Sequence, residues 1–419
     1  MKGRTGNSLL LSEPGVPAVS GSIPLCVPEI RGNEWKYIKE CLDTNFVSSV
    51  GPFVDRFERE LAARVGAKYA VATVNGTSAL HIALLIAGVK SDDEVLVSTL
   101  TFIAPANAIR YAQAWPVFID AEEKYWQMDP QKVADFIEKG CVWKNNVLRN
   151  KATGRHVSAI MPVHILGHPV DMDPIIALAH KYNLIIIEDA TESLGAKYFS
   201  KPLRKNEERR TKNQKQSWRD AGTLGDIACF SFNGNKIITT GGGGMIVTNN
   251  EKWARKAKYL TTQAKDDPVE FIHNEIGYNY RLPNISAAMG CAQLEKLDEY
   301  IAIKRQIATT YTEAFRNIHG LTPMREAKWA FSIFWMFTIL VDEKKYGMTS
   351  RELLRRLASQ NIQARPLWQP MHLSPAHRGP CVLDCSVAER INRTAISLPC
   401  SVGLTKVQQE RVISQIIKS

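Results

Sequence analysis

Three stretches of the 419-residue sequence place small, hydroxylated or charged residues near the end of an apolar run. Residues 75–78 (Asn-Gly-Thr-Ser) follow one run, and small residues before a helix expose backbone N–H groups that suit a phosphate. Asp189 ends a second run, at the position where open α/β sheets bind ligands. Ser231 lies in a third run, and Lys236 comes shortly after it. A lysine shielded from water at such a point can act as a nucleophile toward carbonyls.

Each of these residues alone is more often structural, since Ser, Thr and Asp commonly cap the next helix. Their order along the chain changes that balance, because one cofactor, pyridoxal phosphate, needs all of them. Hydroxyls hold its phosphate, a carboxylate keeps its pyridine nitrogen protonated, and a lysine binds its aldehyde. No GxGxxG follows any of the apolar runs, which argues against a dinucleotide site.

Alternating strands and helices must position these residues. Apolar runs of strand length occur at 69–74, 94–98, 116–119, 158–163, 184–187, 227–232 and 245–248, with helical patterns between them. This predicts an α/β fold with a mostly parallel sheet between helices. A helical segment at 285–315, an apolar strand at 332–341 and further helices predict a smaller α+β domain. The predicted division is an arm at 1–22, a large cofactor-binding domain at 23–284, and a linking helix with the small domain at 285–419.

The net charge of +11 raises the question of a nucleic-acid partner. Residues 139–156 hold five basic and no acidic residues, and 200–220 hold eight basic and three acidic residues, so these two insertions carry +10 of the +11. Both lack periodicity and are predicted to be surface loops, either solvated or flanking the mouth of the site. With no helix-turn-helix pattern or basic strand interleaved with aromatic residues, we expect no nucleic-acid partner.

The cysteine and histidine patterns predict no metal site. Eight scattered cysteines are typical of reduced thiols in a cytoplasmic protein. The pairs Cys381/Cys385 and His164/His168 lack the further ligands that a zinc site requires. No apolar stretch approaches the roughly 18 residues of a membrane span. Near the start only residues 9–11 are apolar, so no signal peptide is predicted.

Longer stretches resemble the DegT/DnrJ/EryC1/StrS family of pyridoxal phosphate-dependent nucleotide-sugar aminotransferases. The matching stretches are NGTSALHIAL (75–84), TFIAPANAI (101–109), PVHILGHPVDM (162–172), IIIEDATESLGA (185–196), GDIACFSFNGNKIITTGGGGMI (225–246) and GYNYRLPNISAAMGCAQLEKLD (277–298). The resemblance extends from about residue 23 to the end of the chain. It implies the fold-type I architecture and a homodimer whose active sites are shared between subunits.

The resemblance also implies roles for particular residues. The implied catalytic residues are Lys236, as the Schiff-base lysine, and Asp189, at the ring nitrogen. The implied cofactor contacts are Gly76, Thr77, Ser78 and Ser231 at the phosphate, Phe102 on the ring, His164 close by, Glu192 near the hydroxyl or the substrate, and Asn279 at the phosphate of the partner subunit. Glu192, Arg281 and His372 are the implied substrate contacts.

The implied reaction moves an amino group from L-glutamate to a nucleotide-linked keto sugar, with Lys236 as general base and acid. Family members that dehydrate their sugar usually carry His in place of this lysine, so Lys236 favours transamination over a lyase or dehydratase reaction. Residues 23–58 resemble the branch that acts on UDP-4-keto-6-deoxy-N-acetylglucosamine. A GDP-4-keto-6-deoxymannose 4-aminotransferase is the close alternative. A 3-keto sugar aminotransferase or a non-catalytic regulator of the same fold is less favoured.

Overall fold

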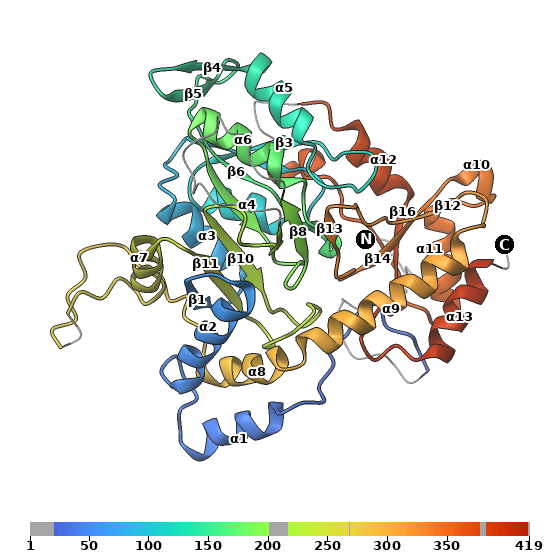
Figure 1. Cartoon of the computed structure of the whole chain (residues 1–419), viewed down its shortest axis with the longest axis horizontal. Helices are drawn as coiled ribbons and strands as arrows, with labels where there is room; N and C mark the ends of the chain where they lie inside the picture. The colour runs from blue at the N-terminus through green and yellow to red at the C-terminus, as the bar shows by residue number, and fades with distance from the viewer. Residues whose placement is uncertain (1–20, 201–216, 268, 378–382, 418–419) are drawn as a thin grey trace, which may run out of the picture.

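A seven-stranded sheet lies at the centre of the computed structural model, which describes residues 21–200, 217–267, 269–377 and 383–417 (Figure 1). The strand order is β1-β11-β10-β7-β6-β2-β3. The strands are β1 (Tyr69–Thr73), β2 (Glu94–Ser98), β3 (Trp115–Ile119), β6 (Val157–Met161), β7 (Ile185–Asp189), β10 (Ile227–Ser231) and β11 (Gly244–Thr248). Each of the seven apolar runs in the sequence therefore forms a strand of this sheet, as predicted.

The sheet is mostly parallel, which confirms the sequence-based prediction. Strands β3, β2, β6, β7 and β10 run parallel, and only β11 is antiparallel to its neighbours β1 and β10. Parallel strands end at one edge of a sheet, which is where α/β proteins place their ligands. Asp189, the last residue of β7, pairs in register with Cys229 of β10, two residues before Ser231. The sheet thus brings two predicted site residues to adjacent strand ends.

Helices cover both faces of the sheet and explain why its strands are apolar throughout. Successive side chains of a strand point to opposite faces. Val95 and Val97 pack in one apolar cluster and Leu96 in the other. Because both faces are buried, an alternating pattern is absent. The helices of this part of the chain are α1 (Glu34–Asp43), α2 (Pro52–Val65), α3 (Gly76–Ile86), α4 (Ala104–Tyr111), α5 (Pro130–Gly140), α6 (Met172–Tyr182) and α7 (Glu251–Thr261).

A second, four-stranded sheet forms after residue 320, in the order β12-β14-β16-β15. Its strands are β12 (Leu321–Pro323), β14 (Phe337–Val341), β15 (Arg365–Pro366) and β16 (Ala395–Leu398), and its helices are α10 (Glu343–Tyr346), α11 (Ser350–Ser359), α12 (Ser386–Thr394) and α13 (Lys406–Ile417). The long helix α9 (Leu297–Phe315) connects the two parts (Figure 1). One apolar cluster is continuous across both, because it includes Val97 of β2 and Phe337 of β14.

Two predicted elements are shorter than the sequence pattern suggested. The helix predicted at 285–315 is two helices, α8 (Asn284–Leu294) and α9, separated at residues 295–296. The backbone departs from regular helix at Lys296, whose φ is −103°, and the Glu295 side chain accepts hydrogen bonds from Asn33, Tyr37 and Arg56. The strand predicted at 332–341 begins only at Phe337. Residues 332–336 form a connecting segment in which Phe334 has a φ of 47°.

The basic insertion at 139–156 is a β-hairpin, which corrects the prediction of a surface loop. Strands β4 (Cys141–Lys144) and β5 (Val147–Asn150) pair around Asn145-Asn146, whose φ angles are 53° and 59°. Asparagine tolerates this left-handed conformation, which two-residue hairpin turns require. Asn150 hydrogen-bonds to Glu94 at the start of β2. The hairpin therefore packs at the amino edge of the sheet, opposite the strand ends that carry Asp189 and Ser231, and does not flank the predicted site.

The insertion at 200–220 is flanked by two strands that pair with each other, and most of the insertion lies outside the described residues. Strands β8 (Lys197–Ser200) and β9 (Ser217–Asp220) pair with each other, and β13 (Ala330–Phe331) pairs with β8. The predicted arm at 1–22 lies outside the described residues except for its last two positions. Within the described part of the chain, no helix has the length and apolar character needed to cross a membrane.

Candidate active site

The turn between β1 and α3 presents hydroxyl groups at a helix start. Asn75 caps α3, because its Oδ1 accepts a hydrogen bond of 2.7 Å from the Ser78 N–H. Among the described residues, nothing hydrogen-bonds to the hydroxyls of Thr77, Ser78 or Ser231, so all three remain free to hold an anion. A Cβ on Gly76 would lie only 2.9 Å from the Ser231 Cβ. The absence of a side chain at Gly76 therefore lets the turn approach Ser231 closely.

The glycine run at 241–244 serves the same turn. The backbone of this run approaches the Asn75 turn closely. A Cβ on Gly244 would lie 2.4 Å from the Asn75 carbonyl oxygen. Since β11 begins at Gly244 and pairs with both β1 and β10, this contact holds the turn at the end of the sheet.

Asp189 places a buried carboxylate at the end of β7. The residue is 2% exposed, and Thr191 alone among the described residues hydrogen-bonds to its carboxylate, with the backbone N–H at 3.1 Å from Oδ1. Burial raises the pKa of the Asp189 carboxyl above its ordinary value, although Thr191 and the more distant Lys236 oppose that rise. A cationic ring nitrogen beside the free oxygen would restore the ionised form.

His164 and Glu188 form a fully buried pair behind Asp189. The His164 Nε2 lies 2.9 Å from Glu188 Oε2, and its Nδ1 accepts the Val170 N–H, so both ring nitrogens are engaged within the chain. The His164 backbone N–H donates to the Asp189 carbonyl oxygen at 3.0 Å. His164 therefore supports the strand end that carries Asp189 and offers no free nitrogen to a ligand.

The neighbouring histidine does not join a metal pair with His164. His168 Nε2 accepts the Ala327 N–H, and its Nδ1 bonds to the Pro169 carbonyl. Burial lowers the pKa of His168 to about 4, so it is neutral at physiological pH. Across the described ranges, no group of three or more His, Cys, Asp or Glu side chains is arranged to hold a metal ion.

Lys236 lies between a carboxylate and an aromatic ring. Its Nζ is 3.6 Å from Glu192 Oε1 and 4.2 Å from the centre of the Trp335 ring, and its side chain is 13% exposed. Glu192 is also fixed from the other side, because its Oε2 accepts the Leu166 N–H at 2.9 Å. Burial raises the pKa of Glu192 to about 7, and the nearby Lys236 opposes that rise. Glu192 is thus able to hold or release a proton next to the lysine near neutral pH.

Three further predicted contacts are Phe102, Arg281 and Asn279. Phe102 is 55% exposed although it is a large aromatic residue, and its ring is therefore accessible to a ligand. Arg281 pairs with Thr73 beside the 75–78 turn, and its Nε is buried without a hydrogen-bond partner in the described chain. Asn279 is exposed at the base of the segment 263–279.

His372 is placed between the two parts of the chain. Its Nδ1 lies 2.7 Å from Thr99 Oγ1, and its Nε2 lies 3.1 Å from Glu389 Oε1. Both ring nitrogens therefore already have partners within the chain, and a contact with substrate would require one of them to be exchanged.

Two residues of this arrangement were missed in the sequence. Glu188 accepts hydrogen bonds from the N–H groups of Gly222, Leu224 and Gly225 in addition to His164. Its place next to Asp189 at a strand end was a usable signal. For Trp335 the sequence offers no such signal, because its contact with Lys236 forms only when two segments distant in the chain pack together.

The residues present fit pyridoxal phosphate. Two free hydroxyls at the start of α3 and one at the end of β10 match the phosphate. An exposed Phe102 ring matches the pyridine face, and Asp189 keeps one carboxylate oxygen without a partner in the described chain. The Lys236 Nζ lies 3.6 Å from Glu192 Oε1, which is longer than a normal hydrogen bond. No short hydrogen bond to Glu192 therefore ties up the lysine amine. The fold and this set of groups define a pyridoxal phosphate enzyme of fold-type I.

Comparison with known proteins identifies the family. Residues 28–417 match the model of the DegT/DnrJ/EryC1/StrS aminotransferase family, and the chain belongs to that family. The chain is 38% identical over 400 residues to EpsN of Bacillus subtilis (strain 168), itself provisionally named a pyridoxal phosphate-dependent aminotransferase, with 94% of this chain and 95% of EpsN covered. It is 36% identical over 395 residues to the GDP-perosamine synthase of Caulobacter vibrioides, with 94% and 97% covered.

A solved structure agrees with this assignment. The crystal structure of S. venezuelae DesV superimposes with a TM-score of 0.78 at 28% identity, covering 92% of this chain and 94% of DesV. The protein is therefore a pyridoxal phosphate-dependent sugar aminotransferase of this family.

Proposed function

We propose that the protein transfers the amino group of L-glutamate to the keto carbon of a nucleotide-linked 4-keto-6-deoxy sugar. The observation that carries this proposal is the placement of Lys236 beside a buried Glu192, with Asp189 at the adjacent strand end. A lysine at this position supplies the base that an amino transfer needs in both of its halves.

Each residue has a defined task in this proposal. Pyridoxal phosphate, when bound, supplies an aldehyde that takes up amines and a ring that draws electrons from the carbon bearing the amine. Thr77, Ser78 and Ser231 donate hydroxyl hydrogens to the phosphate, and Asp189 holds the proton at the pyridine nitrogen. The Lys236 Nζ would hold the cofactor, and as a free amine it would remove the proton from the α-carbon of glutamate.

Glu192 assists Lys236 by storing a proton. Its carboxyl has a pKa of about 7 because it is buried, and Lys236 is its only neighbouring cation at 3.6 Å in the described chain. A group with a pKa near the working pH exchanges protons in both directions. The sugar half of the reaction reverses the glutamate half, so a two-way proton store at this position serves both.

Similarity favours a GDP-linked sugar over the UDP-linked sugar that residues 23–58 suggested. The GDP-perosamine synthase of C. vibrioides is 36% identical to this chain over 395 residues, which cover 94% of it. The proposed acceptor is accordingly GDP-4-keto-6-deoxymannose, and UDP-4-keto-6-deoxy-N-acetylglucosamine is the alternative. The distinction concerns the nucleotide pocket and leaves the lysine chemistry unchanged.

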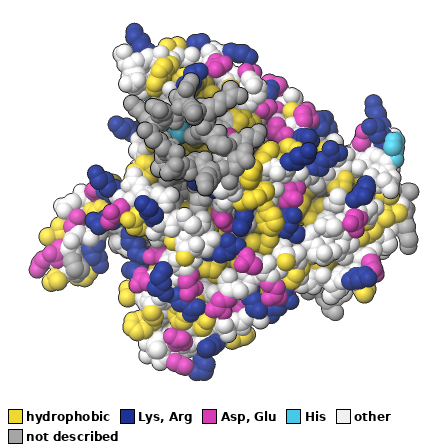
Figure 2. Space-filling model, viewed as in Figure 1, with side chains coloured by type: hydrophobic (Ala, Val, Ile, Leu, Met, Phe, Trp, Pro, Cys, Tyr) yellow, Lys and Arg dark blue, Asp and Glu magenta, His cyan; other side chains and the backbone are white. Residues whose placement is uncertain are grey.

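We also propose that two copies of the chain form the working unit. Residues 263–267 and 269–279 project from the body after α7 (Figure 1), and Figure 2 shows hydrophobic side chains on this projection. Val269, Phe271 and Ile276 are exposed there, Ile276 by 84%. Apolar side chains gathered on an extended segment are typical of an interface. Asn279, at its base, would then reach the cofactor phosphate of the second copy.

A panel of acceptors tests the proposed reaction. The enzyme is incubated with pyridoxal phosphate, L-glutamate and GDP-, UDP- or dTDP-linked 4-keto and 3-keto sugars, and products are identified by mass and NMR. We expect a 4-amino sugar from the GDP-linked substrate together with equimolar 2-oxoglutarate. Exclusive reaction of 3-keto sugars, or product without 2-oxoglutarate, would contradict the proposal, and Lys236→Ala is the matched inactive control.

A further inference from the structure

Trp335 contacts both Lys236 and the residue before it. The Lys236 Nζ lies 4.2 Å from the centre of the indole ring, within the range of a cation–π interaction. The indole Nε1–H donates a hydrogen bond of 2.7 Å to the Asn235 carbonyl oxygen. One side chain thus faces the lysine ammonium and also fixes the backbone immediately before it. Trp335 itself is buried, so its ring has little freedom to turn away.

A buried lysine holds Trp335 from the other side. Lys304 of α9 is 2% exposed, and its Nζ donates a hydrogen bond of 2.8 Å to the Trp335 carbonyl oxygen. Its other described partners are sulfur atoms, Cys26 Sγ at 3.5 Å and Cys400 Sγ at 3.6 Å. The Cys26 thiol in turn donates to the Asn235 carbonyl at 3.3 Å. The four groups Lys304, Trp335, Asn235 and Cys26 therefore form a closed ring of contacts behind Lys236.

The charge of this cluster is unusual, because no carboxylate pairs with the buried ammonium among its described partners. Burial by itself would lower the pKa of Lys304, but the Cys26 and Cys400 sulfurs raise it above its ordinary value. Cys26 and Lys304 together lower the pKa of the Cys400 thiol to about 6, against the effect of burial. A buried charge is costly unless it is fully paired. Apolar packing alone would not require a buried ammonium group such as that of Lys304 at this position.

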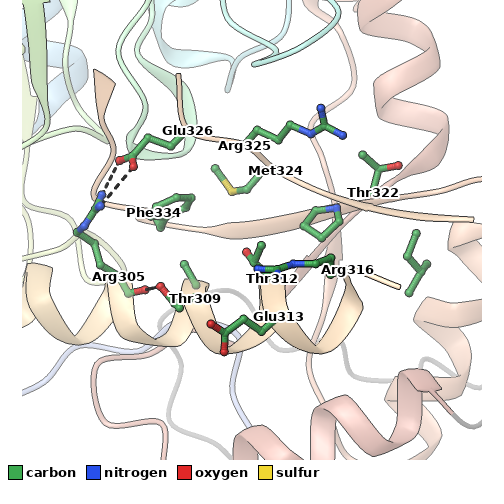
Figure 3. A pocket seen from close by; sticks show the side chains of 13 residues that line it. Arg305, Thr309, Thr312, Glu313, Arg316, Thr322, Met324, Arg325, Glu326 and Phe334 are labelled. Carbon is green, nitrogen blue, oxygen red and sulfur yellow. Dashed lines mark hydrogen bonds and ion pairs between the residues drawn. The ribbon is translucent and has the colours of Figure 1, made fainter. Parts of the chain in front are cut away.

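The neighbouring residue of α9 secures the segment leading to Trp335. Arg305 contacts both carboxylate oxygens of Glu326, at 2.5 and 3.3 Å (Figure 3). It also donates to the Ser332 carbonyl oxygen at 2.5 Å. Consecutive residues of α9, Lys304 and Arg305, thus bind residues 326–335 at two points. The cleft of about 530 Å³ in Figure 3 lies between α9 and residues 321–326, and none of the predicted site residues lines it.

We propose that Trp335 is a positioning residue for Lys236 and that the Lys304–Cys26–Cys400 cluster holds Trp335 in place. The indole N–H fixes the Asn235 carbonyl, and the ring face receives the cationic end of Lys236. Binding of the cofactor then requires little movement of the lysine. The inference rests on the proposed assignment of Lys236 as the cofactor-binding lysine.

The test compares two Trp→Phe variants of the same segment. Trp335→Phe keeps an aromatic face and removes the N–H that holds Asn235. Trp329→Phe is the matched control, because Trp329 contacts the rings of Tyr125, His168 and Tyr198 and not Lys236. For each apoprotein, three quantities are measured: the rate at which the visible band grows on adding pyridoxal phosphate, the rate of Lys236 acylation without cofactor by peptide mass spectrometry, and the Tm.

We expect Trp335→Phe to slow growth of the visible band and to lower kcat, each roughly tenfold, with KM for the nucleotide sugar unchanged. Acylation of Lys236 should change in this variant and stay at the wild-type rate in Trp329→Phe. Lys304→Met should act in the same direction as Trp335→Phe. The inference is overturned if Trp335→Phe and Trp329→Phe lower the Tm alike while both load at the wild-type rate. If the wild type itself fails to load Lys236, the assignment of the lysine has failed instead.

Discussion

Two regions of the proposed site differ: the groups around Lys236 have their partners within one chain, whereas the projecting segment that ends at Asn279 does not. On the lysine side, Asp189, Glu192 and Lys236 are held by buried neighbours, and each has a defined contact at 3.1, 2.9 or 3.6 Å. On the other side, Asn279 is exposed and the segment before it presents Phe271 and Ile276 to solvent. A single chain therefore preorganises the reacting groups, and we infer that a second copy is needed to close the phosphate side.

The largest expected effect falls on the preorganised side. Lys236→Ala removes the group that binds the cofactor and moves the proton, so transamination should drop by at least about 10³-fold. The purified variant should also lack the visible absorption band of the lysine-bound cofactor. Lys296→Ala, which removes a surface lysine paired only with Glu299 within the described chain, is the control and should keep both. A coloured, active Lys236→Ala protein would contradict the assignment.

Mixing two inactive variants tests whether the second side belongs to another copy. In a mixed dimer of Lys236→Ala and Asn279→Ala chains, one site combines an intact Lys236 with an intact Asn279 from the other chain. Co-refolding the two variants should therefore restore activity well above that of either alone. If Asn279 instead serves its own chain, no site in the mixture is intact, and the activity stays at the level of the separate variants.

A change in the projecting segment should weaken self-association. Ile276→Asp places a charge where we expect an apolar contact, and loss of roughly 1.5–3 kcal/mol for each buried aliphatic side chain should shift the protein toward monomer. Sedimentation velocity at several concentrations measures this. Val407→Asp is the matched control, because Val407 is 75% exposed on α13, away from the segment. Equal association by both variants would remove the segment from the interface.

A smaller effect is expected from the proton stored at Glu192. Burial raises the pKa of Glu192 from 4.5 to about 7, so the folded apoprotein holds this proton more tightly than the unfolded chain. The contribution of Glu192 to stability is therefore full below pH 4.5 and is lost as the pH rises through 7. Glu192→Gln keeps an acceptor for the Leu166 N–H and removes the titration.

Urea unfolding at pH 5 and pH 8 measures this prediction. The stability of Glu192→Gln relative to wild type should rise with pH, by about 3 kcal/mol at most, since each unit of pKa shift corresponds to about 1.4 kcal/mol. A difference between the two proteins that does not change with pH would show that Glu192 titrates normally and is no proton store.

Much of the fold was predictable because its signals are local. The seven strands are continuous apolar runs, and their burial on both faces makes each run unambiguous. Residues 75–78, Asp189, Ser231 and Lys236 could be proposed as site residues because each lies at or within a few residues of the end of such a run. The hairpin at 141–150 was missed although its signal was present, since Asn145-Asn146 between alternating residues is a turn sequence.

The parts that were not predictable depend on contacts between distant segments. Trp335 lies 99 positions after Lys236 in the chain, and nothing in its neighbours indicates that its ring faces that lysine. The ring of contacts through Lys304 joins residues 26, 304 and 400, which no sequence period connects. The hydrogen bond between His164 and Glu188 was also not predictable, because the two side chains come together only when neighbouring strands of the sheet pair.

The most direct test of the account is to locate the cofactor on the chain. The holoprotein is reduced with borohydride, digested, and mapped by peptide mass spectrometry. We predict a pyridoxyl group on the peptide that contains Lys236 and on no other lysine peptide. A pyridoxyl group on a different lysine, or an active enzyme that carries none after reduction, would contradict the account.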